Sequence, residues 1–172
     1  RSGKSTFAES LARKRGGDDV LFVATAQALD DEMRARILNH RSARPGTWRT
    51  LEAPRGLANT LPSIPNARVT VVDCATLWVS NILLADENGA FETMMREIDE
   101  LLAWYRASAG ELIIVSNEVG MGLVPDNALG RAYRDLLGAV NQELAAAADE
   151  VFLLVAGLPV EIKSRAVRLE DL

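Results

Sequence analysis

The first residues of the chain have the types and spacing of a phosphate-binding loop. Arg1-Ser-Gly-Lys-Ser5 contains Gly-Lys-Ser, the second half of a Walker A pattern. Gly3 lets the backbone approach phosphate, Lys4 can reach the β- and γ-phosphates, and Ser5 can offer a hydroxyl to Mg²⁺. The first glycine of the pattern is absent, so a chance Gly-Lys-Ser or a tag remnant stays an alternative.

A carboxylate ends an apolar run farther along the chain. Val69-Thr-Val-Val-Asp73 has the form of a Walker B strand, in which a terminal acid helps to hold Mg²⁺ beside the P-loop serine. The alternative is an aspartate that caps the helix after it. Cys74, the next residue, is interpreted as a small buried hydrophobic side chain.

His40 is the only histidine of the chain, and two arginines, Arg41 and Arg44, follow it within four residues. Arginine guanidinium groups bind phosphate oxygens through paired hydrogen bonds. A neutral imidazole can attack phosphorus and form a covalent phosphoramidate. His40 is therefore a candidate nucleophile. The alternative is a surface histidine favoured by the dipole at a helix C-terminus.

A loop with two glycines, Asn117-Glu-Val-Gly-Met-Gly122, is a third candidate. Its glycines allow unusual backbone angles or a close approach to a ligand. A turn does not need the Asn-Glu pair that precedes them, which favours a binding loop over an ordinary strand-to-helix turn.

The elements that must position these residues alternate along the chain. Short apolar runs predict buried parallel strands at 20–24, 69–73, 111–116 and 151–155. Apolar periodicity predicts helices at 6–14, 30–40, 77–84, 91–105 and 128–148. Four prolines make residues 41–66 a loop-rich region. The sequence predicts an α/β fold with a mostly parallel sheet flanked by helices.

Ligands of such folds bind beyond the carboxyl ends of the strands. The residues in those places are polar or rich in glycine, namely Thr25-Ala-Gln27, Asp73-Cys-Ala-Thr76, Asn117 to Gly122, and Gly157. A P-loop normally follows a buried strand. We therefore expect a further strand before Arg1, outside the sequence given, which would make at least five.

Composition narrows the class of protein. A length of 172 residues fits one domain, 1–172, and the net charge of −5 argues against nucleic-acid binding by bulk charge. The single cysteine excludes an internal disulfide and favours a reducing compartment, the cytoplasm. One histidine excludes His-rich metal sites, and no run of 18 apolar residues predicts a membrane span.

The whole pattern resembles the bifunctional adenosylcobinamide kinase/adenosylcobinamide-phosphate guanylyltransferase family of cobalamin biosynthesis. The segments that carry the resemblance are Arg1 to Ser5, Ala24-Thr25, Leu29-Asp-Asp-Glu-Met33, His40 with Arg44-Pro45, Trp48-Arg-Thr50, Asp73-Cys74, Asn117 to Gly122, Val124-Pro125, Asn127, Val140 to Glu150, and Ala156-Gly-Leu-Pro159. They follow the family's order over nearly the whole chain, and they imply its P-loop NTPase (RecA-like) architecture.

The resemblance implies two reactions. A nucleoside triphosphate, ATP or GTP, phosphorylates a hydroxyl of adenosylcobinamide. His40 then attacks the α-phosphate of GTP, and the GMP–histidine intermediate passes GMP to adenosylcobinamide phosphate, giving adenosylcobinamide-GDP. Mg²⁺ acts with the nucleotide, and the family's assembly implies a homotrimer.

The resemblance also implies the site residues. His40 and Lys4 are the catalytic residues, and Ser5 and Asp73 hold Mg²⁺. The nucleotide contacts are Arg1, Ser2, Gly3, Lys4, Ser5, Ala24, Thr25, Ala26, Arg41, Ser42, Ala43, Arg44, Glu52 and Asp73. Two other interpretations stay open: a P-loop kinase of another small metabolite, with a structural His40, and a nucleotide-binding regulatory module.

Overall fold

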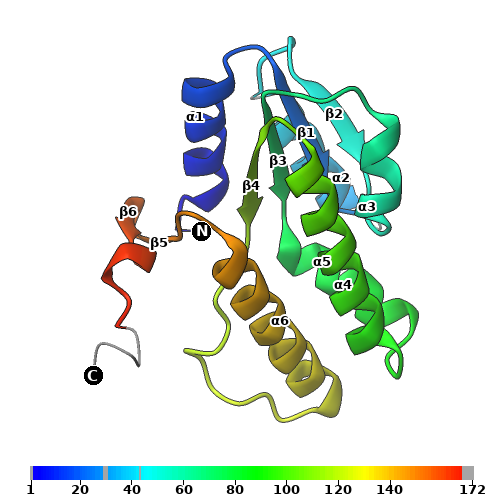
Figure 1. The fold of residues 1–172 in the computed structure, drawn as a ribbon. Helices are drawn as coiled ribbons and strands as arrows, with labels where there is room; N and C mark the ends of the chain where they lie inside the picture. Colours follow the sequence, from blue (N-terminus) through cyan, green and yellow to red (C-terminus); the bar gives the residue numbers. More distant parts are fainter. Residues whose placement is uncertain (1, 29–30, 43, 168–172) are drawn as a thin grey trace.

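A four-stranded parallel sheet forms the centre of the computed structural model (Figure 1). The structure describes residues 2–28, 31–42 and 44–167, without the side chains of Glu32, Met33, Arg36, Asn39 and His40. The strand order is β2-β1-β3-β4. Their bounds are β1 Val20–Ala24, β2 Arg49–Glu52, β3 Val69–Asp73 and β4 Glu111–Val115.

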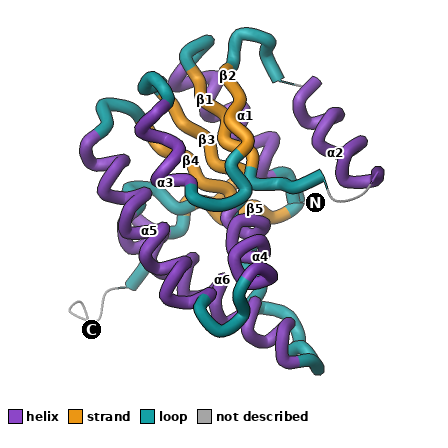
Figure 2. The backbone as a smooth tube through the Cα atoms, turned by 90° about the vertical axis from the view of Figure 1, so that its right-hand side faces the viewer, coloured by secondary structure: helices purple, strands orange, loops and turns teal. Residues whose placement is uncertain are grey.

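Helices cover both faces of the sheet (Figures 1 and 2). On one face lies α1 (Lys4–Gly16). The other face carries α4 (Ala75–Ala85), α5 (Ala90–Ala107), α6 (Ala128–Ala147) and the short α3 (Leu57–Thr60). Beyond the core, α2 (Asp31–Ser42) leads toward β2, and the 3-10 turns η1 (Leu61–Ser63) and η2 (Lys163–Arg165) complete the helical elements of the described residues.

The strands read as continuous apolar runs because both faces of the sheet are buried. In β1, Leu21 and Val23 contact the cluster formed with α4, α5 and α6, whereas Val20 and Phe22 contact the cluster under α1. The predicted α/β fold with a mostly parallel sheet is confirmed, as are the five predicted helices to within a few residues at their ends. No helix in the described part of the chain is both long and apolar enough to span a bilayer.

Two predictions about strands are wrong. Residues 41–66, predicted only as a loop-rich region, also contain the edge strand β2 and the short helix α3. Exposure alternates along the four residues of β2, two of which are charged, so no apolar run marks this strand.

The run at 151–155 forms a strand, β5 (Phe152–Val155), but not one of the parallel sheet. It pairs antiparallel with β6 (Leu158–Glu161) in a separate two-stranded sheet. Ala156 and Gly157, with φ of 50° and 82°, make the connection. A two-residue turn can join only antiparallel strands, because a parallel pair needs a long crossover.

Candidate active site

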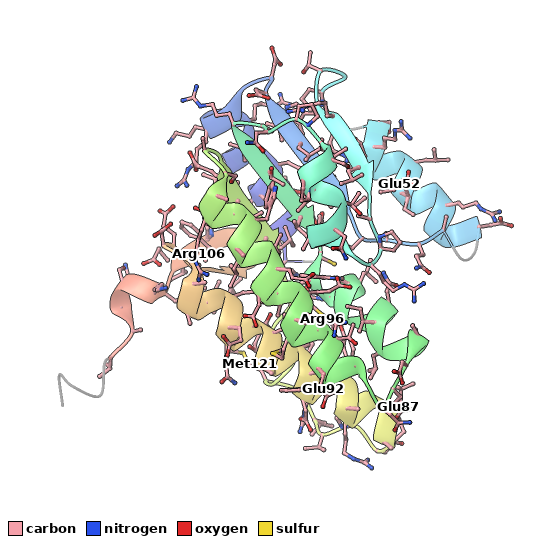
Figure 3. All side chains as sticks on the ribbon, turned by 45° about the vertical axis from the view of Figure 1, so that its right-hand side comes forward. Glu52, Glu87, Glu92, Arg96, Arg106 and Met121 are labelled. Carbon is pink, nitrogen blue, oxygen red and sulfur yellow. The ribbon has the colours of Figure 1, made fainter. Side chains whose placement is uncertain are left out.

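Three of the residues expected to contact nucleotide lie side by side at the carboxyl edge of the sheet. Ala24, the last residue of β1, pairs in register with Glu52 of β2 on one side and with Asp73 of β3 on the other. Glu52 is exposed and Asp73 is partly buried. Figure 3 shows Glu52 on this edge strand. The row Glu52–Ala24–Asp73 therefore places the backbones of two acidic residues about two strand spacings apart, roughly 10 Å.

The N-terminus of α1 lies at the same edge. A short turn joins the end of α1 to the start of β1, so the helix runs opposite to the strands and begins where they end (Figure 1). Gly3 occupies the N-cap position with φ of 92°, and the first turn of α1 holds no acidic residue. The free N–H groups and the dipole of a helix N-terminus favour an anion there. Lys4 Nζ lies 3.5 Å from the Ser2 hydroxyl, its donor contact in this structure.

The β5–β6 turn supports the loop before α1. The Gly157 N–H donates to the Ser2 carbonyl at 3.0 Å. A Cβ on Gly3 would lie 3.3 Å from the Gly157 Cα. On the same side, the rings of Phe7 and Phe152 meet edge to face at 5.2 Å. Gly157, which the sequence predicted to lie at a strand's carboxyl end, thus packs its backbone against the loop before α1.

Arg44 brings a positive charge to this region from the segment after α2. Its guanidinium carbon lies 3.7 Å from the centroid of the Phe22 ring, a cation–π contact. Burial lowers the pKa of Arg44, while the carboxylates of Glu9 and Asp73 oppose that shift and Arg41 adds to it. Arg44 therefore lies within electrostatic reach of Asp73. Arg41 and Ser42, at the end of α2, are exposed.

Some of the expected residues cannot be placed. The backbone of His40 belongs to the last turns of α2, close in sequence to Arg41 and Arg44, but its side chain lies outside the description. Arg1 and Ala43 lie outside the described residues altogether. Ala26, by contrast, follows β1 at the carboxyl edge and is partly buried.

Thr25 is buried with 0% exposure. Its hydroxyl donates to the Cys74 carbonyl at 2.8 Å and accepts from the Cys74 N–H at 2.7 Å. The Cys74 thiol next to it has a raised pKa, chiefly because it is buried, so it stays protonated at neutral pH.

The loop 117–122 follows β4 at the next position along the edge. Asn141 of α6 donates to the Asn117 carbonyl at 2.9 Å and accepts from the Ser116 hydroxyl at 2.6 Å. The Glu118 carboxylate accepts from the Gly120 N–H at 2.5 Å, and Met121 is 82% exposed in this loop (Figure 3). The predicted binding role of this loop stays a prediction.

Two residues near His40 in sequence form hydrogen bonds at the opposite, amino edge of the sheet. Trp48 is buried and donates from its indole to the Gly17 carbonyl at 3.0 Å. Arg49 binds the carboxylate of Asp19 at 3.1 Å and the carbonyl of Pro65 at 2.6 Å. Neither side chain can join a phosphate site at the carboxyl edge in this conformation.

Asn81 was not singled out from the sequence, and Asn141 was named only as part of the segment Val140 to Glu150, although both hold backbone carbonyls at the carboxyl edge. A signal existed. Asn81 is a polar residue in the largely apolar helix α4, between Val79 and Ile82. A polar side chain in such a place usually has a specific hydrogen-bond partner.

Comparison with known proteins bears directly on this site. A family model described as "Cobinamide kinase / cobinamide phosphate guanyltransferase" matches residues 1–162. The chain belongs to this family. The match includes every residue placed at the carboxyl edge above, and it confirms the family that the sequence motifs predicted. It also includes the β5–β6 hairpin, which contacts the loop before α1.

Relatives of known name support the cobinamide kinase/guanyltransferase family assignment. The bifunctional adenosylcobalamin biosynthesis protein CobU of Salmonella typhimurium is 44% identical over 177 residues, covering 95% of each chain. The protein of the same name in Escherichia coli is 42% identical over 176 residues, again covering 95% of each. The bifunctional adenosylcobalamin biosynthesis protein CobP of Pseudomonas aeruginosa is 45% identical over 168 residues, covering 95% of this chain and 92% of the relative.

Proposed function

We propose that this chain first phosphorylates adenosylcobinamide. A hydroxyl oxygen of the corrinoid attacks the γ-phosphorus of ATP or GTP, the bond to the β-phosphate oxygen breaks, and a nucleoside diphosphate leaves as the hydroxyl proton is released. The observation that carries the proposal is the N-terminus of α1 lying at the same sheet edge as the Glu52–Ala24–Asp73 row. This is the place where a parallel α/β sheet binds its ligand.

The second reaction is guanylyl transfer through His40. An imidazole nitrogen of His40 attacks the α-phosphorus of GTP, a P–N bond forms, and pyrophosphate leaves. A phosphate oxygen of adenosylcobinamide phosphate then attacks that phosphorus, the P–N bond breaks, and adenosylcobinamide-GDP is released. A covalent intermediate divides one difficult displacement into two easier ones.

The roles of the other site residues follow from their chemistry. The backbone at Ser2 and Gly3 and the first N–H groups of α1 receive phosphate, and Lys4 neutralises charge on the β- and γ-phosphates. Arg41, Ser42 and Arg44, with Ala43, follow His40 and contact the triphosphate. The remaining nucleotide contacts proposed are Arg1, Ala24, Thr25, Ala26 and Glu52.

The donor set at this edge fits Mg²⁺ held together with a nucleotide. Among the described residues, no group of three or more His, Cys, Asp or Glu side chains could hold a metal by itself. Mg²⁺ typically takes one or two protein ligands and completes its shell with phosphate oxygens and water. Ser5 and Asp73 would hold it, and bound Mg²⁺ would neutralise charge on the phosphates. A homotrimer and a cytoplasmic location stay predictions.

A substitution at His40 tests the division of roles. His40→Ala is expected to abolish GMP transfer to adenosylcobinamide phosphate while phosphorylation of adenosylcobinamide keeps most of its rate. Arg96→Ala, on the exposed surface of α5 (Figure 3), is the control and should affect neither activity. Equal loss of both activities in a folded His40→Ala protein would contradict the separate role of His40. Kinase activity with unchanged GMP transfer would exclude His40 as the nucleophile.

A further inference from the structure

Hydrogen bonds tie together the segments that follow β1, β2 and β3 at the carboxyl edge. The Ala53 N–H donates to the Ala24 carbonyl at 2.9 Å, which joins the ends of β2 and β1. The Thr25 N–H donates to the Asp73 carbonyl at 3.2 Å, which joins the ends of β1 and β3. These two backbone bonds extend the sheet one residue beyond the Glu52–Ala24–Asp73 row. Beyond the row, the side chains of Thr25 and Asn81 hold backbone groups of the segments that follow the strands.

Thr25 has no atom available for a ligand. The residue is 0% exposed, and its hydroxyl is engaged twice with Cys74, as donor at 2.8 Å and as acceptor at 2.7 Å. Its N–H and its carbonyl are also used, the carbonyl by the Asn81 amide at 2.8 Å. A residue in this state can affect a nucleotide only through the groups that it holds. Those groups include the carbonyl of Asp73 and the N–H and carbonyl of Cys74, the residue that follows it.

The Asn81 side chain also forms hydrogen bonds with backbone groups at this edge. It lies on α4, the helix that begins directly after Cys74. Its Nδ2 donates to the Thr25 carbonyl at 2.8 Å and to the Pro54 carbonyl at 3.0 Å. One side-chain amide thus joins the segment after β1 to the segment after β2, while its helix follows β3. All three segments adjoin a residue of the Glu52–Ala24–Asp73 row.

The backbone on the carboxyl side of Asp73 is held by this arrangement. Asp73 is the last residue of β3, and the Thr25 N–H donates to its carbonyl at 3.2 Å. On the carboxyl side, the Cys74 backbone is fixed by the Thr25 hydroxyl. Metal-binding and catalytic side chains need placement within about 0.5 Å, which residues behind them provide.

We propose that Thr25 and Asn81 are positioning residues, which hold the Asp73 carboxylate in the orientation that binds Mg²⁺ with the nucleotide. This inference rests on the proposed function, because it assumes that Asp73 is a ligand of that Mg²⁺. It differs from the expectation for Thr25 drawn from family resemblance, since Thr25 then acts through Cys74 and Asp73 and not by touching the nucleotide. Nothing in the sequence motifs singled out Asn81.

The test measures binding and not turnover. The dissociation constant of GDP is determined by titration calorimetry in Mg²⁺ and in EDTA. The constant in EDTA divided by the constant in Mg²⁺ reports how strongly the metal promotes nucleotide binding, and this quotient is called the ratio below. Thr25→Val removes the hydroxyl with almost no change of shape. It is expected to lower the ratio about tenfold, the usual effect of losing a residue that orients a metal ligand. Thr25→Ser keeps the hydroxyl and should restore the ratio.

Matched controls separate positioning from loss of stability. Thr60→Val removes another partly buried threonine hydroxyl, which donates to the Gly56 carbonyl at 2.9 Å within its own helical turn. It should lower the melting temperature without changing the ratio. If Thr25→Val does not fold, Asn81→Leu is measured in the same way and is expected to lower the ratio.

The outcomes distinguish the inference from the proposed function. Asp73→Asn is expected to lower the ratio most. If Asp73→Asn does so while folded Thr25→Val and Asn81→Leu keep the wild-type ratio, the positioning role is overturned and the proposed metal site stands. If Asp73→Asn leaves the ratio unchanged, Asp73 is not the metal ligand, and both proposals about this edge fail.

Discussion

At the scale of single residues, backbone conformation decides what can occupy the start of α1. Gly3 has φ of 92° and lies against Gly157, whose own φ is 82°. A side chain at Gly3 meets two costs, an unfavourable left-handed backbone and a contact of 3.3 Å with the Gly157 backbone. Ser2 and Gly157 cannot move apart freely to make room, because the Gly157 N–H donates to the Ser2 carbonyl. The loop before α1 therefore depends on glycine at this position.

Gly3→Ala is expected to lower the free energy of unfolding by about 1–2 kcal/mol, the cost of a left-handed residue with a side chain. It should also weaken triphosphate binding, because the loop must shift. Gly138→Ala is the matched control, since Gly138 lies in α6 with open space around it and should gain about 1 kcal/mol from better helix propensity. Urea unfolding and GTP titration measure both effects. Wild-type GTP affinity in Gly3→Ala would contradict the role of this loop.

Substitutions at Arg44 test whether nucleotide binding needs a planar cation within electrostatic reach of Asp73. Arg44→Ala is expected to weaken GTP binding about tenfold, and Arg44→Lys should recover little of it, because an ammonium group neither stacks on Phe22 nor pairs with phosphate in the same planar geometry. Arg68→Ala, an exposed change just before the start of β3, should bind GTP like the wild type. Titration calorimetry compares the three variants. Full recovery by lysine would show that charge alone is required.

Sequence reasoning proposes Lys4, Ser5 and Asp73 as site residues because each belongs to a local motif whose chemistry is visible in a few adjacent residues. It did not reach the part played by Thr25 and Asn81. Their roles consist of hydrogen bonds to backbone atoms 27 to 56 residues away in sequence. Such partners are known only once the fold brings the strand ends together.

At the scale of elements, the β5–β6 hairpin holds itself together through Glu161. Its carboxylate accepts hydrogen bonds from the N–H groups of Val151, Lys163 and Ser164 at 3.2, 2.8 and 3.0 Å, and from the Ser164 hydroxyl. These bonds, led by that of the Ser164 hydroxyl, lower the pKa of Glu161 from 4.5 to about 2. Glu161 therefore fixes both the start of β5 and the turn η2 after β6.

The lowered pKa predicts a pH dependence of stability. The bonds stabilise the folded state fully above pH 4.5, and this contribution disappears as the pH falls through the folded pKa of about 2. Glu161→Gln should therefore melt below the wild type at pH 7, and the difference should narrow below about pH 4.5. Glu143→Gln, an exposed change on α6, is the control. A difference that stays constant down to pH 3 would contradict this account.

The helices and the buried strands could be predicted because their apolar periodicity is long or continuous. The edge strand β2 could not, since pairing with β1 on one side and exposure on the other leave it only a short alternating pattern. The partner of β5 was misjudged for another reason. An apolar run does not tell a parallel strand from an antiparallel one, and Gly157 was interpreted as a strand end and not as a hairpin turn.

At the scale of the whole molecule, a buried carboxylate links three helices behind the site. Glu97 of α5 is 8% exposed. It accepts from the Trp78 indole of α4 at 2.7 Å and from the Gly56 N–H at the start of α3 at 3.0 Å. Since Gly56 directly follows the segment held by Asn81, this contact joins the core to the carboxyl edge.

Glu97→Ala is expected to lower the free energy of unfolding by about 3 kcal/mol, because it leaves the Trp78 and Gly56 N–H groups without an acceptor. Asp99→Ala, an exposed change on the same helix, should stay within about 0.5 kcal/mol of the wild type. Urea unfolding at pH 7 compares them. A loss in Glu97→Ala no larger than in Asp99→Ala would show that the link contributes nothing.

The most direct test of the proposed function is the mass of the intact protein after incubation with GTP and Mg²⁺. The account predicts a mass gain of one GMP that is labile to acid, is absent in His40→Ala and is lost on adding adenosylcobinamide phosphate. Because His40 is the only histidine of the chain, no second imidazole can replace it. If GTP binds and no adduct forms, or if the adduct persists in His40→Ala, the histidine-linked transfer is wrong.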